Sequence, residues 1–324
     1  ADDPPARLSE ELWGDAPGQS GRRVVGEGQV VWGKTARQIL MESRIPPDFE
    51  YTVQGEPATL DYIHRKIEDR DVYFVCNQSD RELETECLFR VTGGSPQLWN
   101  PVTGDFENPN RFTQIGGQMR VSISFAPYGS WFVVLSADSG IGTSEWQSFG
   151  PPFPRWAESQ RIDGPWNVTF ASPWGDTFST IMTQLGDWAE HSDSRIRRHS
   201  GKATYECDFD LPAVGQGTPN RLMLDLGRVE DLGIARVFLN DQDLGILWTK
   251  PFRVEINAAA KTGANRLRVE VLNSWRNRLI GDRDLPAGQA RTTTNITVGK
   301  DWKPAASGLL GPVTILRESP AGTQ

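Results

Sequence analysis

The sequence predicts an all-β protein made of two antiparallel β-sandwiches, one small and one built like a jelly roll, preceded by a short α/β segment. Glycine (32) and proline (22) are frequent among the 324 residues, as in chains where turns join many short strands. Apolar and polar residues alternate over short runs, which is the period of a half-buried strand. The chain is also long enough to bury two separate cores.

Residues 1–58 are predicted to be a short α/β remnant of an upstream domain. The apolar strand Gln29–Trp32 is followed by a helix over Thr35–Ser43. Pro46 and Pro47 end this helix, because the residue before a proline is pushed out of the helical region. One strand and one helix cannot enclose a core. We therefore expect this segment either to be disordered or to pack on a neighbouring domain or chain.

Residues 59–137 are predicted to form the small sandwich. In the run Leu83–Val91, four apolar residues share one face and charged residues share the other, as in a strand with one solvated side. The expected strands of this sandwich are Leu60–His64, Val72–Cys76, Leu83–Val91, Gln97–Trp99, Met119–Phe125 and Trp131–Leu135.

Residues 138–165, rich in Ser, Gly and Pro, are predicted to be a linker, and residues 166–324 a larger jelly-roll sandwich. Its expected strands are Asn167–Phe170, Ala203–Phe209, Arg221–Leu226, Ile234–Leu239, Phe252–Ile256, Asn265–Val271 and Val313–Leu316.

Charge and composition argue against two classes of partner. The net charge of −8 disfavours nucleic acid, because phosphate binding requires clustered cations. No run approaches the roughly 18 apolar residues that a membrane span needs. The acidic loop holding Asp187, Glu190 and Asp193 could bind a structural calcium, since carboxylates on a flexible loop suit that ion. A simply solvated loop remains the alternative, and no cofactor is required.

Two sets of local motifs are more specific than the strand pattern. The first set is Val31–Thr35, Ile45–Phe49, Leu60–Arg65, Asp71–Val75 with Asn77, and Leu98–Gly104. These motifs resemble glycoside hydrolase family 106, the α-L-rhamnosidases and their relatives. The second set is Ser200–Tyr205, Asp225–Val229, Val237–Asn240, Leu244–Gly245, Leu247–Trp248, Pro251–Arg253, Gly263–Leu267, Asn273–Asp282 and Ser307–Val313. The second sandwich, which carries this set, is similar to the sugar-binding, galactose-binding-like domain of family 2 and family 106 enzymes.

The resemblance implies a catalytic barrel upstream, and no catalytic residue can be carried over from it. Such a chain would be a non-catalytic, carbohydrate-associated C-terminal region, supporting the barrel in a secreted or periplasmic bacterial enzyme whose partner is a plant or microbial polysaccharide. One alternative is a glycosidase in its own right, which needs two carboxyl groups facing each other across the scissile bond. The acids that could supply such a pair are Glu145, Glu158, Asp187, Glu190, Asp193, Asp282 and Asp284. Another alternative is a purely structural pair of sandwiches with no ligand.

A sugar site is predicted where aromatic and planar polar side chains gather in loops at strand ends. An aromatic face suits the apolar side of a sugar ring, and bidentate groups suit its hydroxyls. The predicted residues are Trp248, Arg253, Trp275, Arg276, Asn277, Arg278 and Asp282. The competing interpretation is that the tryptophans pack the sandwich and the arginines pair with acids. Exposure of the two tryptophans beside Arg276 and Asn277 distinguishes the two.

Overall fold

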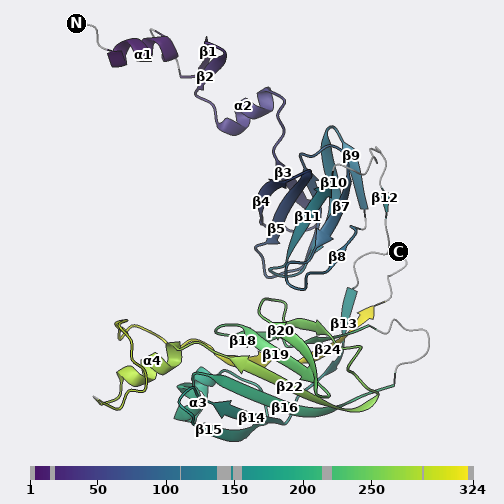
Figure 1. The fold of residues 1–324 in the computed structure, drawn as a ribbon, viewed down its shortest axis with the longest axis vertical. Helices are drawn as coiled ribbons and strands as arrows, with labels where there is room; N and C mark the ends of the chain where they lie inside the picture. The colour runs from purple at the N-terminus through teal and green to yellow at the C-terminus, as the bar shows by residue number, and fades with distance from the viewer. Residues whose placement is uncertain are drawn as a thin grey trace.

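The computed structural model describes residues 4–14, 19–109, 111–136, 147–148, 155–213, 221–286 and 288–319. Figure 1 shows an N-terminal segment, a first β-sandwich and a second β-sandwich following one another along the long axis of the molecule. The predicted all-β class is confirmed. Within these ranges no helix is long and apolar enough to cross a membrane.

The N-terminal segment contains no core of its own. It consists of α1 (Pro4–Trp13), the hairpin β1 (Gly21–Val25) and β2 (Gly28–Trp32), and α2 (Ala36–Glu42). The side chain of Thr35 caps α2 in a reciprocal capping box with Gln38, as expected for a short helix start. Trp13 and Trp32 meet edge to face at 5.8 Å. No described side chain from residue 7 to residue 48 is buried.

The first sandwich is two five-stranded antiparallel sheets packed face to face. One sheet has the order β12-β9-β10-β6-β3 and the other β4-β5-β11-β7-β8. The strands of the first are β3 (Phe49–Val53), β6 (Leu83–Phe89), β9 (Arg111–Ile115), β10 (Gln118–Phe125) and β12 (Gln147–Ser148). Those of the second are β4 (Leu60–Ile67), β5 (Arg70–Asn77), β7 (Ser95–Trp99), β8 (Phe106–Glu107) and β11 (Ser130–Ser136). The inner faces enclose an aromatic core that includes Tyr73, Phe89, Phe112 and Phe125.

Two edge strands of this sandwich lie outside the predicted range 59–137, so its strands run from residue 49 to residue 148. Strand β3 extends the sheet beside β6, and β12 pairs with β9. Local patterns give little indication of either strand, because edge strands are short and pair on one side only. At the other end, Arg155–Arg161 forms β13, which pairs with β24 of the second sandwich. The predicted linker 138–165 therefore includes a strand of each sandwich.

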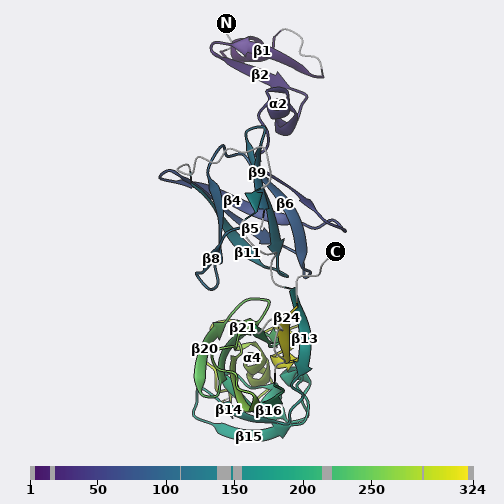
Figure 2. The ribbon, with the colours of Figure 1, turned by 90° about the vertical axis from the view of Figure 1, so that its right-hand side faces the viewer.

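The second sandwich packs a four-stranded sheet, β13-β24-β17-β21, on a six-stranded sheet, β15-β14-β16-β22-β19-β20. The short pair β18–β23 lies beside them. Its remaining strands are β14 (Trp166–Ala171), β15 (Thr177–Met182), β16 (Lys202–Leu211), β17 (Leu222–Asp225), β18 (Arg228–Glu230), β19 (Ile234–Leu239), β20 (Gln242–Leu247), β21 (Arg253–Glu255), β22 (Gly263–Leu272), β23 (Gly308–Gly311) and β24 (Thr314–Ser319). The helical pieces are the 3-10 turn η1 (Trp188–Glu190), α3 (Ser194–Arg197) and α4 (Arg276–Arg283). In Figure 2 the strands of this sandwich form a ring, and α4 lies along the axis of that ring.

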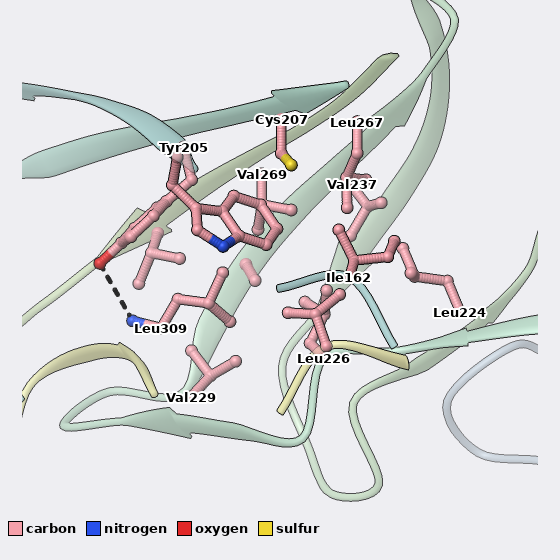
Figure 3. Packing of buried hydrophobic residues seen from close by; sticks show 14 of the residues in the cluster. Ile162, Tyr205, Cys207, Leu224, Leu226, Val229, Val237, Leu267, Val269 and Leu309 are labelled. Atoms are coloured by element: carbon pink, nitrogen blue, oxygen red, sulfur yellow. Dashed lines mark hydrogen bonds between the residues drawn. The ribbon is translucent and has the colours of Figure 1, made fainter. Parts of the chain in front are cut away.

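A buried tyrosine of the six-stranded sheet bonds to β23 within the core of this sandwich (Figure 3). The hydroxyl of Tyr205 accepts hydrogen bonds from the backbone N–H of Leu309 at 3.2 Å and from Nε1 of Trp188 at 2.6 Å. Burial raises the pKa of Tyr205, so the phenol stays neutral. Each of these buried polar groups thus has a partner, which removes the cost of desolvating it.

Candidate carbohydrate-binding site

Five connections meet at one end of the six-stranded sheet. The strand register aligns Ala171, Lys202, Leu272 and Ile234 across four neighbouring strands, and Leu247 pairs with Ala235 on the next. The turns 172–176, 199–201 and 231–233, the segment 273–307 and the loop after β20 therefore leave the sheet at the same end. Figure 1 shows α4 projecting from the sandwich there.

The first of these turns carries Trp174 at its tip. The backbone N–H of Ser172 donates to the carbonyl of Asp176, and that of Gly175 donates to the carbonyl of Ser172. Gly175 has a φ of +90°, a region that glycine enters without a Cβ penalty. Nothing lies within 4 Å of a Cβ placed on Gly175, so the backbone conformation alone favours glycine here.

Buried polar side chains fix the chain after β22. The amide oxygen of Asn273 accepts from the N–H of Gly201 at 3.0 Å, and its nitrogen donates to the carbonyl of His199 at 2.8 Å. The N–H of Ser274 donates to the carboxylate of Asp231 at 2.6 Å. These hydrogen bonds hold the backbone immediately before Trp275 against the turns 199–201 and 231–233 at the same end of the sheet.

Trp174 and Trp275 form an aromatic pair on this locked backbone. Their ring centroids are 5.5 Å apart with planes at 73°, the edge-to-face arrangement that aromatic quadrupoles favour. Trp275 is 50% exposed although its backbone is held on both sides. About half of Trp275 therefore faces solvent beside Trp174, on a backbone that hydrogen bonds hold in place, and this gives a flat apolar surface that a ligand could reach.

Helix α4 and the segment that follows it are held by two buried side chains. Asn277, 3% exposed, donates to the carbonyl of Ala305 at 2.7 Å and accepts from its N–H at 2.8 Å. Asp282, 5% exposed, accepts from Nε of Arg278 at 2.8 Å and from the N–H and hydroxyl of Thr292. Arg291 of the same segment pairs with Asp176 in the turn that carries Trp174.

The charge of Asp282 is retained in spite of its burial. Burial raises the pKa of this carboxyl, but hydrogen bonds from Arg278 and Thr292 outweigh it and hold the pKa below its usual value. A carboxylate fully occupied in this way has no capacity left for a sugar hydroxyl or for proton transfer. Its role is to fold the segment 284–307 onto α4.

The seven predicted sugar-site residues fall into an exposed group and an internally paired group. Trp275 and Trp248 are exposed, at 50% and 55%. Asn277, Arg278 and Asp282 are paired internally, and that they reach a ligand stays a prediction. Arg278 and Asp282 pair with each other on α4, and the further partners of Asn277 and Asp282, at positions 291–307, follow a loop that local sequence does not place.

The two remaining arginines also have partners. Nε of Arg276 donates to the carbonyl of Lys303 at 3.0 Å, and its guanidinium lies 5.1 Å from the ring centre of Trp302. Nε of Arg253 pairs with Asp225 at 2.7 Å, in the four-stranded sheet. Trp174 was not predicted, although a tryptophan between proline and glycine at the tip of a turn was a usable signal.

In the acidic loop predicted to bind calcium, Asp187 and Asp193 cap the N-termini of η1 and α3. Asp187 accepts from the N–H of Ala189 and the N–H of Ser307, and Asp193 accepts from Arg195. The side-chain bond from Arg195 lowers the pKa of Asp193 to about 2. Glu190 lies exposed on η1. In the part of the chain described, no three His, Cys, Asp or Glu side chains gather as a metal site.

Two of the carboxylates considered for hydrolysis are occupied by other groups. Asp284 is bound by the neighbouring Arg283 at 2.8 Å, and Asp282 is occupied by Arg278 and Thr292. Glu158 lies exposed on β13. Glu145 falls outside the described residues. Asp282 and Asp284 are thus held by neighbouring groups, whereas glycoside hydrolysis requires one acid that can give up a proton across the scissile bond.

Comparison with known proteins shows which family this chain is similar to. Residues 1–113 match the family model described as alpha-L-rhamnosidase, glycoside hydrolase family 106. The resemblance to family 106 is confirmed. The solved rhamnosidase from Novosphingobium sp. PP1Y has 30% identity and a TM-score of 0.74, over 97% of this chain and 28% of that chain.

Other relatives are similar over less of the chain. A putative beta-glucuronidase of Formosa agariphila is 35% identical over 178 residues, covering 48% of this chain and 15% of the relative. A beta-glucuronidase from an uncultured Clostridium sp. has 23% identity over 39% of this chain and 24% of its own, with a TM-score of only 0.29. The chain thus spans less than a third of the length of each of these relatives. The family match and the solved rhamnosidase relate the chain to carbohydrate-active proteins.

Proposed function

We propose that this chain is a non-catalytic, carbohydrate-associated region of a secreted or periplasmic family 106-type glycoside hydrolase, where it supports a catalytic domain. The support is the match to the family together with the arginine partners that occupy Asp282 and Asp284, two of the acids considered for hydrolysis. The partners are the catalytic domain of the same protein and a plant or microbial polysaccharide.

The single observation that carries a binding role is the Trp174–Trp275 pair, in which Trp275 is 50% exposed and Trp174 is half-buried. One face of a pyranose ring presents C–H groups, and these pack on an indole face much as other apolar groups do. Because the surrounding turns are fixed by buried hydrogen bonds, binding there costs little conformational entropy. The pair therefore suits a terminal sugar such as α-L-rhamnose.

Two alternatives have specific counter-observations. A glycosidase acting on its own needs a proton-donating acid with a raised pKa, whereas the pKa values of Asp282, Asp284 and Asp193 are all lowered by arginine partners. A purely structural role gives no reason for the 50% exposure of Trp275, unless another domain covers this side chain.

The test combines catalysis and binding. The chain is first assayed on aryl α-L-rhamnoside and a panel of other aryl glycosides, where we expect no turnover. Binding of α-L-rhamnose is then followed by protein-observed NMR for the wild type and for Trp275→Ala, with Ile181→Ala, an equally superficial change at a 67% exposed residue, as control. A tenfold loss of affinity in Trp275→Ala alone, about 1.4 kcal/mol, supports the site. Turnover abolished by Glu158→Gln, or equal binding by both variants, contradicts the proposal.

A further inference from the structure

A continuous row of large apolar side chains crosses the outer face of the β4-β5-β11-β7-β8 sheet. The strand register pairs Ile63 with Phe74, Phe74 with Phe132, Phe132 with Trp99, and Trp99 with Phe106. Directly paired residues point to the same side of a sheet, so all five share one face. Inward-facing neighbours such as Tyr73, at 0% exposure, confirm that the row lies on the solvent side. We call these five residues the aromatic row.

The aromatic row is exposed rather than covered. Phe106 is 67% exposed, Ile63 55% and Trp99 38%, and the two central phenylalanines are half-buried. The rings of Phe74 and Phe132 lie 5.0 Å apart, and those of Trp99 and Phe106 lie 6.4 Å apart. Nε1 of Trp99 donates to Oε1 of Gln97 at 3.2 Å, which fixes the indole on the surface.

The outer faces of two other sheets have the opposite character. On the six-stranded sheet, ion pairs cover the surface, among them Arg266–Glu206 and Arg268–Glu270. On the partner sheet of the first sandwich, Glu86 lies between Arg111 and Arg120. These two faces thus carry ion pairs, as expected for water-facing strands, and the apolar residues exposed on the six-stranded sheet include Ile181 on β15 and Ile246 on β20, the two edge strands. The aromatic row differs because its apolar residues are contiguous across five strands, and an exposed apolar strip of this kind indicates an interaction surface.

We propose that the aromatic row binds an extended polysaccharide chain lying across the strands. With strands about 4.8 Å apart, four steps give a strip roughly 19 Å long and one side chain wide. That shape suits a linear chain whose successive rings stack on successive side chains. It is narrow for a protein partner, because a specific protein interface uses about 20–30 residues on each side.

Polar groups flank the aromatic row on the same face, where the edges of stacked sugar rings would lie. Asp61 and Arg65 flank Ile63 at alternate positions of β4, and Gln97 precedes Trp99 on β7. Sugar hydroxyls need such donors and acceptors when the apolar ring face is covered. The inference rests on the carbohydrate association proposed above, but it uses a surface separate from the Trp174–Trp275 pair.

The test is affinity electrophoresis of the whole chain through gels containing a β-1,4-glucan, a β-1,4-galactan, a mannan or a rhamnose-containing pectic polysaccharide. We expect at least one to retard the wild type. The double change Trp99→Ala with Phe106→Ala should raise the apparent dissociation constant at least tenfold. Phe106→Ala alone, at a highly exposed residue of a two-residue strand, should raise it several-fold without endangering the fold.

Matched controls distinguish the aromatic row from the Trp174–Trp275 pair and from a protein contact. Ile67→Ala removes a side chain of the same strand and face, with the same 55% exposure as Ile63 but outside the aromatic row, and should bind as the wild type does. Trp275→Ala should also bind normally. If Trp275→Ala alone abolishes retardation, the site proposed earlier stands and the aromatic row does not bind. Absence of retardation by all four polysaccharides overturns the inference. So does a concentration-dependent dimer that Trp99→Ala dissociates, since the face would then be a protein contact.

Discussion

The second sandwich should lose stability between pH 7 and pH 5 because of one buried histidine. His199 is 5% exposed and lies against the ring edges of Phe170 and Trp188, at 5.0 and 5.6 Å between centroids. Its Nε2 has no hydrogen-bond partner among the described residues. Burial lowers the pKa of His199 to about 4, opposed only by a hydrogen bond with the backbone of Lys202. The neutral ring is therefore the form that the folded protein accommodates.

The magnitude follows from the difference in proton binding between the folded and unfolded chains. The unfolded imidazole titrates near 6.5 and the folded one near 4. Between these values the unfolded state binds more protons, so the free energy of unfolding falls as the pH falls below 6.5 and levels off near 4. From pH 7 to pH 5 this amounts to about 2 kcal/mol.

Urea unfolding followed by tryptophan fluorescence at pH 7 and pH 5 measures this loss. His199→Gln removes the titrating group, so the second sandwich of this variant should show little pH dependence, whatever its stability at pH 7. His191→Gln, at a half-buried residue whose Nδ1 accepts from the N–H of Asp193, should keep the wild-type dependence. A His199→Gln protein that still loses about 2 kcal/mol over this interval would refute the reasoning.

Three further outcomes are expected. Asp282→Asn should speed limited proteolysis of the segment 284–307. In the wild type the same segment should loosen as the pH falls below about 4, because the pKa of Asp282 is lower in the folded than in the unfolded chain, and the stability that this contributes is lost as the carboxylate becomes protonated. Gly308→Ala should lower the melting temperature by several degrees more than Gly245→Ala: both glycines have positive φ, but only at 308 would a Cβ meet the ring of Trp188, at 2.3 Å. Cys87, whose pKa burial raises to about 12, should resist alkylation of the native protein at pH 8 and react at once in urea.

Strands with a strict alternation of apolar and polar residues were predictable from the sequence, and a mainly polar strand without that alternation was not. Leu83–Phe89 has buried and solvated residues in strict alternation, and its apolar face defined both the strand and its orientation. Strand β13, Arg155–Arg161, carries mainly polar residues and pairs along one side only. Its partner β24 is more than 150 residues away in the sequence, so no local pattern indicates the pairing. Such strands depend on tertiary context rather than on propensity.

The candidate site was predictable in its aromatic part alone. Trp275 follows a clear strand and precedes polar residues, which was enough to place it at a strand end. Asn277 and Asp282 had the residue types of a sugar site but serve as internal supports. Asn277 and Asp282 are buried, and buried polar groups need hydrogen-bond partners. Those partners lie in an irregular segment whose position cannot be predicted from sequence periodicity.

The three parts of the molecule differ in how they obtain stability. Each sandwich encloses its own aromatic core, whereas the N-terminal segment buries none of its described side chains from residue 7 to residue 48. Its apolar residues, including Trp13, Val24 and Leu40, are between 39% and 74% exposed. A capping box and one tryptophan pair contribute too little to hold a short helix and a hairpin in water. We propose that the segment packs on a surface outside the described residues, and the catalytic domain proposed above would supply that surface, since the family match runs through this segment into the first sandwich.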